Sequence, residues 1–149
     1  MEIITVNDHK KDYLDLLLLA DEQESMIDHY LQRGRMFAFY DQGELIGTAV
    51  VTDEGDKNYE LKSIVVYPRF QNRGFGKEMV RAVFGMVEET ADTLWVGTGD
   101  TPKMMGFYQK CGFRVSHRVK DFFSTHYDHP MVEEGVLLRD MVYLRHDFR

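Results

Sequence analysis

The feature that most constrains the fold is a glycine-containing turn set between an apolar run and an amphipathic stretch. Ile64-Val65-Val66 ends a predicted strand, Tyr59–Val66, and a continuous apolar run of this kind indicates a strand buried on both faces of a sheet. A helix is predicted over Phe75–Thr90, with apolar residues on one stripe: Met79, Val83, Met86 and Val87. A strand–turn–helix unit in the middle of the chain therefore predicts an α/β or α+β sheet domain.

The turn itself, Gln71–Gly76, has the physical properties of an anion cradle. Gly74 and Gly76 allow a tight backbone with exposed N–H groups, and the helix that follows adds the positive end of its dipole. Arg73 and Lys77 add positive charge. The spacing fits neither the dinucleotide fingerprint nor the Walker loop. A pyrophosphate would fit here, although the glycine pattern alone equally allows a plain strand-to-helix turn.

The rest of the chain alternates between predicted strands and helices. Further strands are expected at Glu2–Val6, Met36–Tyr40, Leu45–Val51, Leu94–Gly97, Phe113–Val119 and Val136–Leu144. Further helices are expected at Asp8–Ala20, Asp21–Gly34 and Thr101–Lys110, with Asp8 and Thr101 as N-caps. We find no repeat and no linker, so residues 1–149 are predicted to form one domain.

Composition excludes several classes of protein. A hydrophobic content of 44% supports a real core, and a net charge of −7 argues against nucleic-acid binding. A single cysteine, Cys111, excludes an internal disulfide and a cysteine-built metal cluster. The apolar run Leu16–Ala20 is too short to span a membrane, and Met1–Lys11 lacks the order of a signal peptide. We therefore expect a cytoplasmic protein without a membrane partner.

Two ordered motifs resemble those of the GNAT superfamily of N-acetyltransferases. The segment from Ile64 through Gln71-x-Arg73-Gly74-x-Gly76 resembles the superfamily's acetyl-CoA signature, Gln/Arg-x-x-Gly-x-Gly/Ala. The segment Phe107–Phe113, FYQKCGF, resembles its FYxKxGF segment. The order of elements matches over nearly the whole chain. The resemblance implies a GNAT fold: a mixed central sheet of about six to seven strands, splayed between strands 4 and 5 and flanked by about four helices.

The resemblance also implies acetyl-CoA as cosubstrate, with its pantetheine arm lying along the splay. Ile64 and Val66 should then offer free backbone groups, and the Ile64 N–H should polarise the thioester carbonyl. One such donor is worth about 3 kcal/mol. Little role is expected for the side chains of Gln71 and Asn72. The implied cofactor-binding residues are Ile64, Val65, Val66, Gln71, Asn72, Arg73, Gly74, Phe75, Gly76, Lys77 and Tyr108.

By family position, Tyr108 matches the tyrosine that protonates the leaving thiolate of coenzyme A. A general acid of this kind contributes about 100-fold or more. The alternative is a core position, because Met104, Phe107, Tyr108 and Cys111 recur at helical spacing. Cys111 is interpreted as a small buried residue rather than a nucleophile.

An amine must lose a proton before it attacks a thioester, so a base is required. Glu60 matches the glutamate base of histone-acetylating members of the superfamily. Regular alternation along a strand predicts that Glu60, Lys62, Ile64 and Val66 share one face. The alternatives are a water chain in place of Glu60, or a solvated carboxylate that merely pairs with Lys62.

A long insertion, Lys120–Gly135, departs from the minimal family pattern. Its aromatic residues predict that it packs over the acceptor pocket or forms a dimer contact. A metal site at His126 and His129 is less expected than a scattered surface pair, so we predict no metal. The acids Asp21, Glu22 and Glu24 either favour a helix N-terminus or line a pocket for a cation.

Taken with the resemblance, these features predict direct transfer of acetyl from acetyl-CoA to a primary amine in a ternary complex. The acceptor is a small-molecule amine or a protein amine, and the negative charge favours cationic acceptors such as polyamines or lysine side chains. The alternative is a catalytically silent acyl-CoA-binding regulatory module. A homodimer, common in the superfamily, is compatible with the sequence.

Overall fold

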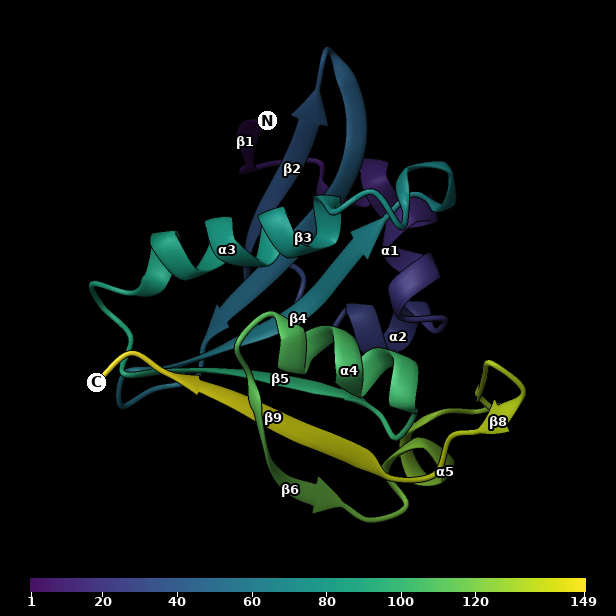
Figure 1. The fold of residues 1–149 in the computed structure, drawn as a ribbon. Coiled ribbons are helices and arrows are strands. Elements are labelled where there is room, and N and C mark those ends of the chain that lie inside the picture. The colour runs from purple at the N-terminus through teal and green to yellow at the C-terminus, as the bar shows by residue number, and fades with distance from the viewer.

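The computed structural model describes residues 1–149 and is built around one seven-stranded sheet (Figure 1). In spatial order the strands are β1 (Glu2–Val6), β2 (Arg35–Asp41), β3 (Glu44–Asp53), β4 (Asn58–Val66), β5 (Thr93–Gly99), β9 (Met141–Asp147) and β6 (Arg114–Val119). Neighbouring strands are antiparallel except β4 and β5, which are parallel. The sheet is therefore mixed, as predicted.

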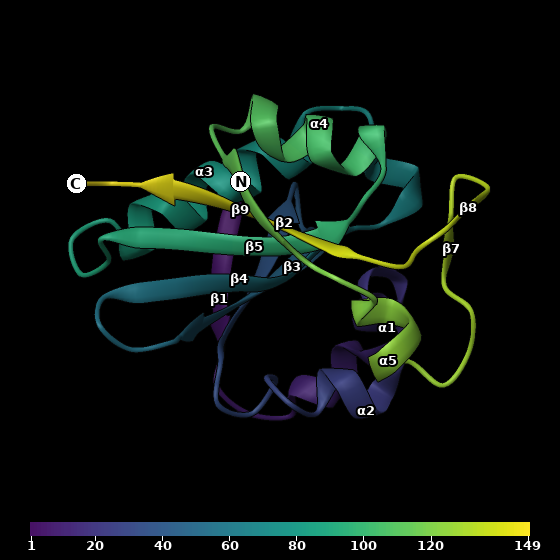
Figure 2. The same ribbon diagram turned by 90° about the horizontal axis from the view of Figure 1, so that it is seen from below.

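Helices cover both faces of the sheet (Figure 2). One face carries α3 (Phe75–Val87) and α4 (Pro102–Lys110), and the other carries α1 (Leu14–Ala20), α2 (Glu24–Ile27) and α5 (Phe122–His126). Short 3₁₀ turns precede α1 at Lys10–Tyr13 and follow β4 at Pro68–Phe70. None of these helices is long and apolar enough to cross a membrane.

Alternation along the strands supplies a core on each side of the sheet. On β2, Phe37 and Phe39 pack with the residues of α3, whereas Met36 and Ala38 pack with those of α1 and α2. All four side chains are buried. Both faces of the strand are apolar because both faces are covered.

The parallel strands β4 and β5 separate part-way along their length. They pair only between Asn58–Leu61 and Thr93–Val96, so the ends of both strands beyond this point lie apart. Tyr67 N donates to Ile46 O on β3 at 2.9 Å, and the Val65 carbonyl faces Gly47 of β3. Because backbone groups alternate in direction along a strand, those of Ile64 and Val66 face the gap. The predicted splay between strands 4 and 5 is confirmed.

Two expected helices are shorter than predicted. The first begins as the 3₁₀ turn, and Asp8 accepts from the adjacent His9 N–H at 2.8 Å instead of capping a helix. The second ends at Ile27 and continues to Gly34 as hydrogen-bonded turns. The Lys10 side chain holds the carbonyls at the end of this segment, a tertiary contact that helical periodicity does not contain.

The end of the chain also differs from the prediction. The strand expected at Val136–Leu144 is two elements, because Val136–Leu137 forms β8 and pairs with β7 (Val132–Glu133) in a separate hairpin. Glu134 and Gly135 form its tight turn, both with positive φ. The central strand β9 starts only at Met141.

Candidate active site

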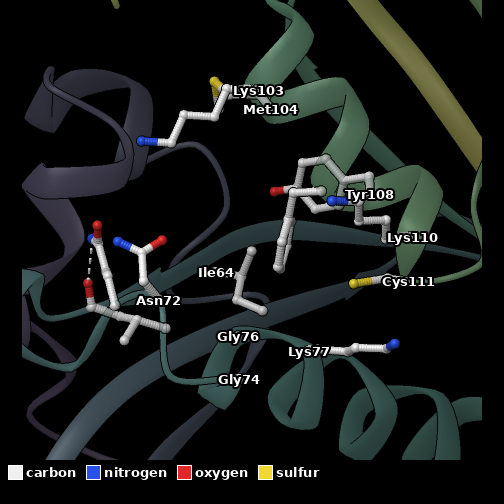
Figure 3. A pocket seen from close by; sticks show the side chains of 13 residues that line it. Ile64, Asn72, Gly74, Gly76, Lys77, Lys103, Met104, Tyr108, Lys110 and Cys111 are labelled. Carbon is white, nitrogen blue, oxygen red and sulfur yellow. Dashed lines mark hydrogen bonds between the residues drawn. The ribbon is translucent and has the colours of Figure 1, made fainter.

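A cavity of about 550 Å³ opens between the glycine turn and α4, and we name it the turn cavity (Figure 3). It is lined by Ile64, Val66, Gln71, Asn72, Gly74, Gly76, Lys77, Lys103, Met104, Phe107, Tyr108, Lys110 and Cys111. The structure thus brings together eight of the eleven residues predicted to bind the cofactor. Val65, Arg73 and Phe75 do not line it. The lysines of α4, Lys103 and Lys110, were missed, although their spacing from Phe107, at i−4 and i+3, could have indicated them.

The backbone of the turn presents a row of free donors. No amide from Asn72 to Lys77 donates to another group of the protein, and the first amide that does is Glu78 N, to Gly74 O at 3.2 Å. Asn72 and Gly74 have φ of 62° and 85°, which folds the turn into a concave nest. Free amides, the N-terminus of α3 and Lys77 suit an anion such as a pyrophosphate.

The Gln71 side chain has a structural role that was not expected. Its Nε2 donates to the carbonyl of Val66 at 2.9 Å. That carbonyl has no strand partner because it faces the gap, so the Gln71 amide satisfies it. Gln71 thereby joins the glycine turn to the free end of β4.

A second cavity, of about 260 Å³, passes through the gap between β4 and β5, and we name it the gap cavity. Gly97–Gly99 of β5 form one side, and Asp21 lines it at the face that carries α1 and α2. The residues that line both the gap cavity and the turn cavity are Ile64, Val66, Gln71, Met104 and Tyr108. The two cavities therefore meet beside Ile64 and Tyr108.

Tyr108 combines the two interpretations that the sequence left open. Its ring is 8% exposed and packs edge-on against Phe107 and Phe113, with centroids 5.1 and 5.8 Å away. Burial, with the thiol of Cys111 and the carboxylate of Glu133 nearby, raises the pKa of Tyr108. The phenol stays protonated at neutral pH, so it can donate a proton where the two cavities meet.

A bulge in β4 overturns the predicted face of Glu60. Leu61 pairs with Val51 and Ser63 pairs with Val50, so Lys62 is an extra residue on β4. The extra residue reverses the alternation. Glu60 therefore faces α1 and α2, whereas Ile64 packs with the core under α3. The prediction that Glu60 and Ile64 share a face is wrong.

Glu60 is mostly buried on the face of the sheet that carries α1 and α2. Its side chain is 12% exposed, with Lys62 Nζ at 3.1 Å, and it accepts from the Tyr143 hydroxyl at 3.4 Å. Burial raises the pKa of Glu60, and Lys62 opposes that shift. It lines a third cavity, of about 310 Å³, which we name the outer cavity. The pairing with Lys62 was one of the alternatives, but the carboxylate is mostly shielded from solvent rather than lying freely at the strand end.

The insertion lies over the gap cavity. Phe123 and Met131 line the cavity and form a small buried cluster with Leu138. Asp128 N donates to Gln23 Oε1 at 2.9 Å, which ties the insertion to the segment between α1 and α2. His129 pairs at the surface with Asp128 at 2.6 Å and with Glu22 at 3.7 Å. Of the three acids near α2, only Asp21 lines a cavity with Tyr108.

Residues 5–113 match the model of the Acetyltransferase (GNAT) family. The chain belongs to this family. The N-acetyltransferase YvbK of Bacillus subtilis strain 168, itself described as uncharacterized, is 39% identical over 132 residues, which are 87% of this chain and 85% of YvbK.

Two solved GNAT structures are similar over nearly the whole chain. A GNAT acetyltransferase from Elizabethkingia anophelis with acetyl-CoA bound is 32% identical, with a TM-score of 0.92 over 98% of this chain and 97% of that one. A Bacillus subtilis acetyltransferase in complex with CoA is 36% identical, with a TM-score of 0.91 over 98% and 97%. The GNAT fold, N-acetyltransferase activity and acetyl-CoA as cosubstrate, all predicted from the two motifs, are thereby confirmed.

Proposed function

We propose that this GNAT enzyme transfers acetyl from acetyl-CoA directly to a primary amine held in the same complex. The observation that carries the proposal is the meeting of the turn cavity and the gap cavity at Ile64 and Tyr108. Acetyl-CoA occupies the first cavity and the amine reaches the thioester through the second. Holding both reactants in this way supplies much of the rate, because a bimolecular step becomes effectively unimolecular.

The turn cavity suits the cosubstrate, which supplies an activated acetyl group as a thioester. The free amides between Asn72 and Lys77 bind its pyrophosphate. The free backbone groups of Ile64 and Val66 receive the pantetheine arm in the position of an additional strand. The Val66 carbonyl already accepts from Gln71 Nε2, and its second lone pair can accept from the pantetheine arm.

Two groups of the chain act on the reacting atoms. The Ile64 N–H faces the gap and stabilises the negative charge that develops on the thioester oxygen. One such donor lowers the activation free energy by about 3 kcal/mol. Tyr108 donates its phenolic proton to the thiolate of coenzyme A as it leaves. Cys111 lines the same cavity, but burial raises the pKa of its thiol, which favours direct transfer over an acetyl-cysteine intermediate.

Glu60 accepts the amine proton through water rather than by direct contact. It lies four residues before Ile64, at most about 13 Å along β4 because the bulge at Lys62 shortens the strand, and it lies on the opposite face. The outer cavity that it lines shares Asp21 and Lys62 with the gap cavity, which gives water a route between them. Its raised pKa makes Glu60 a better proton acceptor than an ordinary carboxylate.

The test is a kinetic study with a panel of alkyl amines, aralkyl amines, polyamines and lysine peptides. Release of free coenzyme A thiol is followed, and each product is identified by mass. We expect saturation by acetyl-CoA and intersecting double-reciprocal plots, the pattern of a ternary complex. Parallel plots would contradict direct transfer. Saturable binding without turnover of any amine would instead support the silent acyl-CoA-binding module.

The role of Glu60 is tested separately with Glu60→Gln. We expect kcat to fall at low pH and the loss to shrink as the pH rises, because a larger fraction of the free amine then arrives already neutral. An unchanged pH profile would remove Glu60 from the mechanism and leave a water chain as the base.

A further inference from the structure

Asp21 occupies a position that the amine-transfer scheme leaves without a role. It is the residue directly after α1, and its extended backbone conformation (φ −139°, ψ 101°) ends the helix. Its side chain lines both the gap cavity and the outer cavity. Glu133 lines only the gap cavity and Glu60 only the outer one, so Asp21 is the one carboxylate common to both.

Two phenols, Tyr30, which is buried, and Tyr127, which is half-buried, fix the orientation of this carboxylate. The Tyr127 hydroxyl donates to Oδ1 at 2.7 Å and the Tyr30 hydroxyl donates to Oδ2 at 3.2 Å. A carboxylate has about four lone-pair sites, so the two phenols leave room for further donors. Burial raises the pKa of both phenols, which keeps them as donors throughout the working pH range.

The phenols orient Asp21 but bring no positive charge. No lysine, arginine or histidine forms an ion pair with Asp21, and Lys62, which lines the same cavity, pairs with Glu60 at 3.1 Å. A partly buried carboxylate without a cation is costly, and burial correspondingly raises the pKa of Asp21. A positively charged ligand would supply the missing partner.

The gap cavity has an apolar wall beside its polar groups. Leu19, Phe123, Met131, Leu138 and Met141 form this wall, whereas Lys62, Ser63, Thr98 and Glu133 are polar residues of the lining. Its volume, about 260 Å³, accommodates a small aralkyl or alkyl group. The cavity therefore places the oriented carboxylate of Asp21 beside an apolar wall.

We propose that Asp21 is the specificity-determining residue of the acceptor site, and that it selects a primary ammonium ion with a compact apolar body. The proposal rests on the proposed function, because it concerns the same site. Asp21 binds the ammonium group by charge-assisted hydrogen bonds, and Tyr127 and Tyr30 position Asp21. Asp21 itself forms and breaks no covalent bond.

The first test compares two acceptors that differ in charge at neutral pH: phenethylamine, which is a cation, and an aniline, which is neutral. For Asp21→Asn we expect kcat/KM for phenethylamine to fall about 10- to 150-fold, mainly through KM, as befits loss of a charged hydrogen bond. We expect kcat/KM for the aniline to change less than about 3-fold. Glu22→Gln is the matched control, since Glu22 is the adjacent acid but exposed. Equal losses for both acceptors, or no loss, would overturn the proposal.

A second measurement separates this inference from the proposed function. Calorimetry of the wild-type enzyme saturated with CoA should show phenethylammonium binding at least 10-fold more tightly than phenethyl alcohol, its uncharged analogue. If no amine is acetylated but this preference is present, the proposed function fails, whereas the preference of the gap cavity for an ammonium group stands. If amines are acetylated without the preference, the inference fails alone. The measurement needs no variant, so a folding defect in Asp21→Asn cannot obscure it.

Discussion

Tyr108 shows how one residue serves packing and chemistry with different atoms. Its ring packs between Phe107 and Phe113, and its hydroxyl reaches the junction of the turn cavity and the gap cavity. For Tyr108→Phe we expect kcat to fall about 100-fold, because only the proton donor is lost. KM for acetyl-CoA and the melting temperature should stay near wild type. Thiol-release kinetics measure kcat and KM, and calorimetry measures the melting temperature. An unchanged kcat would mean that Tyr108 is a core residue only.

Gly74 controls the direction of the free amides. Its φ is 85°, and a Cβ placed there would meet no atom within 4 Å, so Gly74→Ala introduces backbone strain without a clash. We expect a loss of about 1–2 kcal/mol in unfolding free energy, and weaker acetyl-CoA binding as the turn relaxes.

Gly85→Ala is the matched control for Gly74→Ala. Gly85 lies within α3, also in open space, but without a positive φ. The same added methyl should there stabilise the protein by about 1 kcal/mol and leave acetyl-CoA binding unchanged. Denaturant unfolding and acetyl-CoA titration check both variants, and equal effects would show that the conformation of Gly74 has no special role.

At the scale of elements, Lys10 ends the α2 segment from a distance. It is 7% exposed, and its Nζ donates to the carbonyls of Leu31 at 2.9 Å and Gly34 at 2.7 Å. Burial lowers the pKa of Lys10, but its Nζ also donates to the carbonyl of Gln32 at 3.3 Å, and three hydrogen bonds use all three protons of the charged form. For Lys10→Met we expect the free energy of unfolding to fall by about 2–4 kcal/mol, because the buried carbonyls lose their hydrogen-bond donor.

Lys11→Met is the control for Lys10→Met. Lys11 is the adjacent lysine, and it pairs at the surface with Glu24 and Asp28, both at 2.7 Å. Exposed ion pairs of this kind contribute less than about 1 kcal/mol to the free energy of unfolding. Urea unfolding of both variants checks the contrast, and similar losses would contradict the anchoring role of Lys10.

The elements also show where sequence reasoning stops. The glycine turn was predictable because its free amides and its helix depend on neighbours a few residues away. The bulge at Lys62 was not, since a one-residue shift in register depends on how β3 pairs with β4. Asp21 was weighed only as a helix-end acid or a pocket residue. Its phenol partners, Tyr30 and Tyr127, lie 9 and 106 residues away in sequence, and only the folded chain brings them together.

On the scale of the whole molecule, the sheet separates the proposed cosubstrate site from the proposed amine site. The turn cavity lies on the side of α3 and α4, whereas Asp21 and Glu60 lie on the side of α1, α2 and α5. The gap between β4 and β5 joins the two sides. The insertion reaches both sides, because Phe123 and Met131 line the gap cavity and Glu134 pairs with Lys103 of the turn cavity at 3.0 Å. A change in the insertion can therefore affect the amine site and the cosubstrate site together.

The closing strands carry a charge network that couples stability to pH. Asp147 on β9 accepts from Arg114 Nη2 of β6 at 2.7 Å, from Thr93 Oγ1 of β5 at 2.8 Å and from Arg145 at 2.7 Å. Arg145, followed by Arg114, holds the pKa of Asp147 well below its usual range. The folded-state pKa is thus below the unfolded value of about 3.9, so the stabilisation is fully present above about pH 4 and lost as the pH falls further.

For Asp147→Asn we therefore expect a lower melting temperature than wild type above about pH 5, and a difference that shrinks towards pH 2. The wild-type curve of melting temperature against pH should be the steeper of the two below pH 4. Asp56→Asn is the control, because the Asp56 side chain is exposed and makes no hydrogen bond or ion pair, and its curve should follow wild type. Parallel curves for Asp147→Asn and wild type would mean that the carboxylate of Asp147 does not couple the β5–β9–β6 edge of the sheet to pH.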